Sequence, residues 1–278
     1  MSPWRRETLA AGVDADGLAL LARRDGAWRV AAQVPVADYL AAPQAADTDW
    51  TGVVGALLAQ PSVGRGRVAV TVDDSLARYW LLQAPRGIAS LVELRALAAS
   101  RFETLFGEPA SAWHIEADWR ADHAMLAAAL PRTLTRALAD ACAARRWRLE
   151  SLVPRALRTL DRHARDIGRD AALVVFGAHG QVAMRWQGGV PVWLRQRTDV
   201  SADVAQLLSW LETEALRAGH VMPTDVLLAG ELPFSVNAAV MPDYRVRMLD
   251  SARPMPMIAA GSTGAAAVLA MAAQGMPS

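Results

Sequence analysis

The sequence predicts an α/β protein built from two similar halves, and three observations support this prediction. Each half begins with three short apolar strands joined by glycine turns. Each half then continues in the order helix, strand, helix, strand, which is an internal repeat of element order. The chain has 278 residues and is 53% hydrophobic, which is enough for two cores. We therefore predict two lobes, residues 1–166 and residues 167–278, each with a mixed sheet covered by helices.

The first lobe opens on a meander of three strands. Asp16-Gly17 and Asp25-Gly26 each lie between apolar runs, and an Asp-Gly pair in that position is a strong hairpin signal. Pro131 and Pro154 stand where helices are expected to begin, because proline suits the first helical turn. The predicted strands cover 9–14, 18–23, 28–34, 67–73, 125–130 and 149–153, and the predicted helices cover 50–59, 132–147 and 154–165.

A small strand–helix–strand module is predicted as an insertion in the first lobe, at about residues 76–120. Its strands are expected over 77–83 and 112–117, with a helix over 91–106 between them. Apolar residues recur in this helix at spacings of three and four, which gives it one apolar face: Leu91, Leu94, Ala98, Phe102 and Leu105.

The second lobe repeats the pattern, with strands expected over 171–176, 182–186, 190–195, 225–229 and 245–249. Ser201 is expected to cap a helix whose buried face is Val204, Leu207, Leu208, Leu211 and Ala215. Further helices are predicted over 232–240 and 257–271. The last stretch is shorter than the roughly 20 apolar residues that a membrane-spanning helix needs, so we expect an intracellular protein without a membrane span.

Composition excludes several function classes. All 29 basic residues are arginine, so a Schiff-base, P-loop or kinase-type lysine is absent. A formal net charge of +1 gives no electrostatic case for nucleic-acid binding. The five histidines show no HxxxH or HExxH spacing, so no metal site is predicted. Cys142 is the one cysteine, and we expect it to be an inert thiol packed in an alanine-rich helix.

The element order is that of the duplicated actin-like (ribonuclease H-like) two-lobed fold, and two segments resemble one family with that fold. Gly12–Val36 (GVDADGLALLARRDGAWRVAAQVPV) and Ser75–Trp119 resemble the opening and the inserted subdomain of PilM-type actin-like proteins of type IV pilus assembly. The cytoplasmic domain of the GspL-type platform protein of type II secretion is similar to the second segment as well. GspL-type proteins continue into a membrane-spanning helix, so the end of this chain favours the pilus family, while the choice between pilus and secretion stays open.

The resemblance implies a nucleotide site between the lobes, but its phosphate-binding turns are altered. Active members have Asp-x-Gly-x-x-Ser/Thr in the first turn, whereas residues 14–19 read DADGLA, which lacks the hydroxyl and adds the charge of Asp16. The second turn, residues 174–180, lacks the carboxylate that helps to hold magnesium. Ordinary turn chemistry explains Asp14 and Asp16. We expect no cofactor, with magnesium ATP as the disfavoured alternative, and a vestigial nucleotide site at Asp14, Gly17, Gly177, Gly180 and Gly230.

The resemblance further implies a non-catalytic scaffold at the cytoplasmic face of the bacterial inner membrane, in a type IV pilus or type II secretion machine. The expected partner is the cytoplasmic tail of a PilN-type bitopic membrane protein, and the motor ATPase is a second candidate. We expect the tail to lie as an extended peptide in a groove of the small module. This groove is lined by Trp80, Leu82, Leu94 and Ile115, whose other interpretation is the module's own core. The alternatives are an actin-like ATPase or kinase with divergent turns, and an actin-like filament former.

Overall fold

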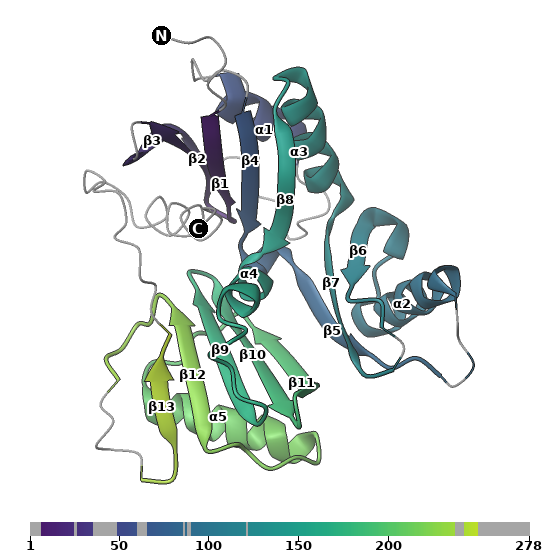
Figure 1. Cartoon of the computed structure of the whole chain (residues 1–278), viewed down its shortest axis with the longest axis vertical. Coiled ribbons are helices and arrows are strands. Elements are labelled where there is room, and N and C mark those ends of the chain that lie inside the picture. Colours follow the sequence, from purple (N-terminus) through teal and green to yellow (C-terminus); the bar gives the residue numbers. More distant parts are fainter. Residues whose placement is uncertain are drawn as a thin grey trace.

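Two five-stranded sheets and one three-stranded sheet form the described part of the chain (Figure 1). The computed structural model describes residues 7–24, 27–35, 49–59, 66–85, 87, 90–120, 122–236 and 242–249. The predicted helix over 257–271 and residues 237–240 of the predicted helix over 232–240 lie outside these residues.

The first sheet has the strand order β3-β2-β1-β4-β8. Its meander consists of β1 (Glu7–Val13), β2 (Gly17–Arg24) and β3 (Ala27–Pro35), which pair antiparallel. β4 (Gly66–Val72) then pairs in parallel with β1, and β8 (Arg148–Pro154) pairs in parallel with β4. Among the described strands, β8 therefore lies at the edge of this sheet.

The second sheet has the order β11-β10-β9-β12-β13, which repeats the first sheet position by position. β9 (Ala171–Gly177), β10 (Gly180–Gln187) and β11 (Val190–Arg197) form the antiparallel meander. β12 (Asp225–Gly230) and β13 (Arg245–Met248) follow in parallel. The predicted duplication and the α/β class are confirmed.

Helices cover the sheets as the binary pattern predicts. α1 (Trp50–Ala59) and α3 (Arg132–Ala144) lie side by side on the first sheet, and α5 (Val204–Arg217) covers the outer face of the second (Figure 1). α4 (Arg155–Arg162) lies between the lobes and contacts both β8 and β9. Among the described residues, no helix combines the length and hydropathy that crossing a membrane requires.

β9, in the middle of the second sheet, is buried along its whole length. Its side chains alternate between the two faces of the sheet. Leu173 and Val175 of β9 belong to the core that is shared with the first lobe and α4. Val174 and Phe176 point the other way, into the core beneath α5. The continuous apolar run of β9 thus joins the second lobe to the first.

The inserted module is larger than the sequence predicted. It contains β5 (Arg78–Leu82), α2 (Leu91–Phe106) and β6 (Trp113–Ala117), as expected. β7 (Met125–Pro131), which the sequence analysis placed outside the module, pairs antiparallel between β5 and β6. The module is called the subdomain below and comprises these four elements.

Three local predictions were wrong. Asp203, and not Ser201, caps α5, and the buried Ser201 instead donates its backbone N–H to Oε1 of Gln181 at 3.0 Å. Residues 232–236 are not helical. Leu91 and Leu105, assigned to the apolar face of α2, are each 45% exposed, so that face consists of Leu94, Ala98 and Phe102.

Candidate functional site

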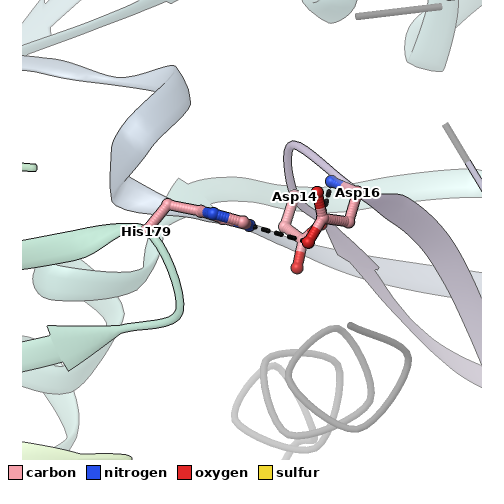
Figure 2. A group of neighbouring side chains, drawn as sticks. All are labelled: Asp14, Asp16 and His179. Carbon is pink, nitrogen blue, oxygen red and sulfur yellow. Dashed lines mark hydrogen bonds and ion pairs between the residues drawn. The ribbon is translucent and has the colours of Figure 1, made fainter. Parts of the chain in front are cut away.

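Two turns from different lobes meet where the resemblance places a nucleotide (Figure 2). Asp14 and Asp16 belong to the turn between β1 and β2, and His179 belongs to the turn between β9 and β10. Nε2 of His179 lies 3.2 Å from Oδ2 of Asp16. This imidazole–carboxylate contact bridges the two lobes.

In the β1–β2 turn, backbone amides donate hydrogen bonds to a side chain of the same turn. Oδ1 of Asp14 accepts hydrogen bonds from the backbone N–H groups of Asp16 at 2.5 Å and Gly17 at 3.0 Å. The N–H of Asp14 in turn donates to the carbonyl of Gly17 at 2.9 Å. This is the local side-chain-to-backbone bonding typical of aspartate in turns. These amides are therefore engaged by the turn's own carboxylate.

Asp14 itself is fully buried. Its Oδ2 has no hydrogen-bond partner among the described residues. The pKa of Asp14 is raised to about 6, mainly by burial. The charges of Asp73 and Asp16 act in the same direction, while the hydrogen bond from the Asp16 amide and the charge interaction with His179 oppose them. The site thus holds a buried carboxylate with one oxygen engaged by the turn and the other without a hydrogen-bond partner among the described residues.

Two further buried carboxylates follow β4. Oδ1 of Asp73 accepts the N–H of Ser75 at 3.0 Å, and the N–H of Asp73 donates to the carbonyl of Val13 at 2.7 Å. Oδ1 of Asp74 accepts the N–H of Ala156 at 2.9 Å and the hydroxyl of Tyr79. Burial and the charge of Asp73 raise the pKa of Asp74 to about 7.

Arg155, the first residue of α4, connects the lobes beside these carboxylates and is 1% exposed. Its Nη1 donates to the carbonyl of Phe176 in β9 at 2.9 Å, and its Nε lies 3.9 Å from Oδ2 of Asp73. Sequence reasoning missed this residue, because nothing in the local pattern distinguishes it from the other arginines.

The glycines that the sequence analysis assigned to the nucleotide turns stand where other atoms of the chain approach the backbone closely. A Cβ on Gly177 would lie 2.9 Å from Oδ2 of Asp73, so the second lobe approaches this carboxylate directly. Gly230 has a φ of +91°, and a Cβ there would lie 2.1 Å from the carbonyl oxygen of Phe176. Gly17 and Gly180 are the first residues of β2 and β10. The fold brings Asp14, Gly17, Gly177 and Gly180 to the two facing turns and places Gly230 at the end of the adjacent β12.

Three of the four side chains predicted to line a partner groove belong to the core of the subdomain. Trp80, Leu82 and Leu94 are between 2% and 5% exposed, and together with Phe102 and Trp113 they form the core of the subdomain. Ile115 packs against this core and is partly buried. The apolar face of α2 covers the three-stranded sheet, which leaves Trp80, Leu82 and Leu94 almost without exposed surface.

A different groove of about 1060 Å³ lies where the subdomain, the first sheet, α3, α4 and the second sheet meet. Every residue from Leu149 to Pro154 of β8 lines it, and Trp186 and Pro191 contribute from the second lobe. Five leucines on its wall are only partly buried: Leu126, Leu149, Leu152, Leu157 and Leu160. This surface, called the β8 groove below, is apolar and open.

Comparisons with known proteins identify the fold. No protein family model matches the chain, and no curated protein sequence matches it. The cytoplasmic domain of EpsL, an inner-membrane component of the type II secretion system of Vibrio cholerae, is similar with a TM-score of 0.51 and 13% identity, over 97% of this chain and 94% of that one. A Bacteroides thetaiotaomicron protein with an actin-like ATPase fold has a TM-score of 0.58 and 8% identity, over 90% and 93%. A chain of the PilM–PilN type IV pilus biogenesis complex has a TM-score of 0.55 and 15% identity, over 88% and 89%.

These identities are low, so the likeness concerns the backbone arrangement. It agrees with the repeated strand order of the two sheets. The chain has the actin-like fold, with a subdomain inserted in the first lobe.

Proposed function

We propose that the chain is a non-catalytic actin-like scaffold of a type IV pilus or type II secretion assembly platform, and that it docks the cytoplasmic tail of a bitopic inner-membrane protein. The observation that carries this proposal is the β8 groove. The similarity to the cytoplasmic domain of EpsL and to the PilM–PilN complex supports the setting at the inner membrane.

The groove suits an extended peptide. Among the described strands, β8 is the last of its sheet and pairs with β4 alone, and every residue from Leu149 to Pro154 lines the groove. A segment that adds to a free strand edge gains main-chain hydrogen bonds, and pockets for alternate side chains provide specificity. The partly buried leucines supply such apolar pockets.

The charge of the groove favours a basic tail. Five carboxylates line the groove against the two arginines Arg132 and Arg136: Glu116, Asp118, Asp140, Glu150 and Asp161. Cytoplasmic segments beside a membrane span are enriched in lysine and arginine. A short tail with apolar and basic residues would therefore complement both the wall and the rim.

The inter-lobe turns support the non-catalytic part of the proposal. Two amides that a phosphate would need already donate to Asp14. Four carboxylates gather at this junction, where they would repel an anionic triphosphate: Asp14, Asp16, Asp73 and Asp74. The alternative, an ATPase or kinase with divergent turns, predicts saturable binding of magnesium ATP that Asp14→Ala abolishes. Calorimetric titration separates the two, and we expect no saturable heat.

A synthetic peptide tests the docking. Its sequence is the cytoplasmic tail of the bitopic protein encoded beside this chain, and its binding is measured by fluorescence anisotropy. Burying a leucine contributes about 1.5–3 kcal/mol, so Leu152→Glu on β8 and Leu157→Glu on α4 are each expected to weaken binding at least about tenfold. Asp140→Arg, on the exposed rim, should weaken it in a salt-dependent manner.

The matched control is Leu216→Glu, because Leu216 is 79% exposed on α5 and does not line the groove. Circular dichroism confirms that each variant is folded. The assignment fails if the groove variants are folded and bind with wild-type affinity, or if Leu216→Glu weakens binding equally.

A further inference from the structure

Three metal-ligating side chains from both lobes gather at the inter-lobe junction. Asp14, Asp16 and His179 each offer one ligand atom, and these atoms lie within 4.8 Å of one another. In the part of the chain that the structure describes, this is the one such group of three. Figure 2 shows the imidazole reaching from the β9–β10 turn toward the carboxylates of the β1–β2 turn.

A second observation points to a ligand at this position. Asp14 is fully buried, and the amides of Asp16 and Gly17 hold its Oδ1 in a fixed orientation. Its Oδ2 has no hydrogen-bond partner in the described structure. A buried polar atom without a partner is costly and calls for an explanation such as an ion. The arrangement is that of a metal-ligating carboxylate that is oriented through its other oxygen.

We propose that Asp14, Asp16 and His179 bind one divalent transition-metal ion of the Zn²⁺ class without a nucleotide, and that this ion links the two lobes. An imidazole nitrogen with carboxylate oxygens is a donor set that zinc accepts, whereas magnesium prefers oxygen ligands alone. Ligand atoms about 2.1 Å from a tetrahedral ion lie roughly 3.4 Å apart. The 3.2 Å between Nε2 of His179 and Oδ2 of Asp16 is close to this separation.

The site has three protein ligands, so water completes the coordination. Binding requires the neutral imidazole and both ionised carboxylates. Because Asp14 and Asp16 belong to one lobe and His179 to the other, the ion would tie the β1–β2 turn to the β9–β10 turn. The inference does not depend on the β8 groove, which lies on other elements.

Calorimetric titration of ZnCl₂ into tag-free, chelator-treated protein tests the site. We expect one equivalent to bind, and Zn²⁺ at about 100 times its dissociation constant to raise the thermal midpoint by roughly 5–10 °C. Loss of an outer-shell partner already weakens metal sites 10–100-fold, so His179→Ala and Asp16→Asn should each weaken binding at least about tenfold. Both side chains are partly exposed, which favours folded variants.

His163→Ala is the matched control, because His163 forms a comparable pair with Asp166 at 3.1 Å but belongs to no group of three. This variant should bind Zn²⁺ as the wild type does. The proposal is overturned if the wild type shows no saturable one-to-one binding, if His179→Ala and Asp16→Asn retain full affinity, or if His163→Ala loses it. Binding of Mg²⁺ alone with equal affinity would overturn the assigned metal class.

Discussion

Replacing Asp74 by asparagine is expected to stabilise the folded protein at neutral and alkaline pH. Oδ1 of Asp74 accepts hydrogen bonds from the N–H of Ala156 and the hydroxyl of Tyr79, and asparagine retains this oxygen. The groups that face Asp74 are Asp73, Tyr79 and Arg155. Burial and the charge of Asp73 raise its pKa to about 7, although the Tyr79 and Ala156 hydrogen bonds and Arg155 oppose this. Asparagine removes the buried charge and keeps its contacts.

The magnitude follows from the difference between the ordinary pKa of 3.8 and about 7. At 1.36 kcal/mol for each pKa unit, this difference corresponds to on the order of 4 kcal/mol. The folded state holds the proton more tightly than the unfolded state, so this contribution to the unfolding free energy is fully present below pH 4. It is lost as the pH rises through about 7. The variant should therefore match the wild type near pH 4 and exceed it by up to about 4 kcal/mol at pH 8.

Urea unfolding followed by circular dichroism, at several pH values and in the presence of a chelator, measures this difference. Asp140→Asn is the control, because Asp140 is an exposed carboxylate on α3. Its difference from the wild type at pH 8 should be small compared with that of Asp74→Asn. The reasoning is refuted if Asp74→Asn is less stable than the wild type at pH 8, or if its stability difference is independent of pH.

Three further predictions concern the backbone at Gly230, the core residue Leu94 and the thiol of Cys142. Gly230→Ala should lower the unfolding free energy in urea by more than about 2 kcal/mol, because the new Cβ would collide with the carbonyl of Phe176. The control is Gly188→Ala, which should cost about 1 kcal/mol, because Gly188 also has a positive φ (+62°) but its Cβ would lie in open space. An equal loss for both would contradict this. Leu94→Ala should lower the unfolding free energy by about 2–5 kcal/mol in the same measurement, as expected for truncation of a buried core leucine. A negligible loss would favour the original assignment of Leu94 to a docking surface. Burial raises the pKa of the Cys142 thiol to about 11. Its reaction with a disulfide reagent at pH 8 should therefore be at least about 100-fold slower in the folded protein than in urea. Similar rates in the two states would contradict the burial of this thiol.

The fold was predictable because its signals are local. The Asp16-Gly17 pair marks a hairpin at the β1–β2 turn, and Pro131 and Pro154 immediately precede α3 and α4. Periodicity identified the buried face of α5. Each of these signals depends on residues that are close together in the sequence, so the predicted element is also found in the folded chain. The membership of β7 in the subdomain sheet was missed because strand pairing depends on partners far along the chain.

The candidate sites depend on contacts between distant segments, so the sequence predicted them only in part. Asp14 was identified through its turn, but its proximity to His179 is created by the folding of both lobes. The spacing of histidines along the chain carries no information about such a group. Likewise, an apolar helix face predicts burial without showing what covers it, so Leu94 was misassigned. The predicted contact with the motor ATPase stays a prediction.

A crystal structure grown with both the tail peptide and magnesium ATP tests the central claim most directly, since it reports on the groove and the turns together. We predict peptide density along the free edge of β8, against the leucines of the β8 groove, and no triphosphate between the β1–β2 and β9–β10 turns. An ordered triphosphate in those turns, or a peptide bound elsewhere with the β8 groove empty, would contradict the account.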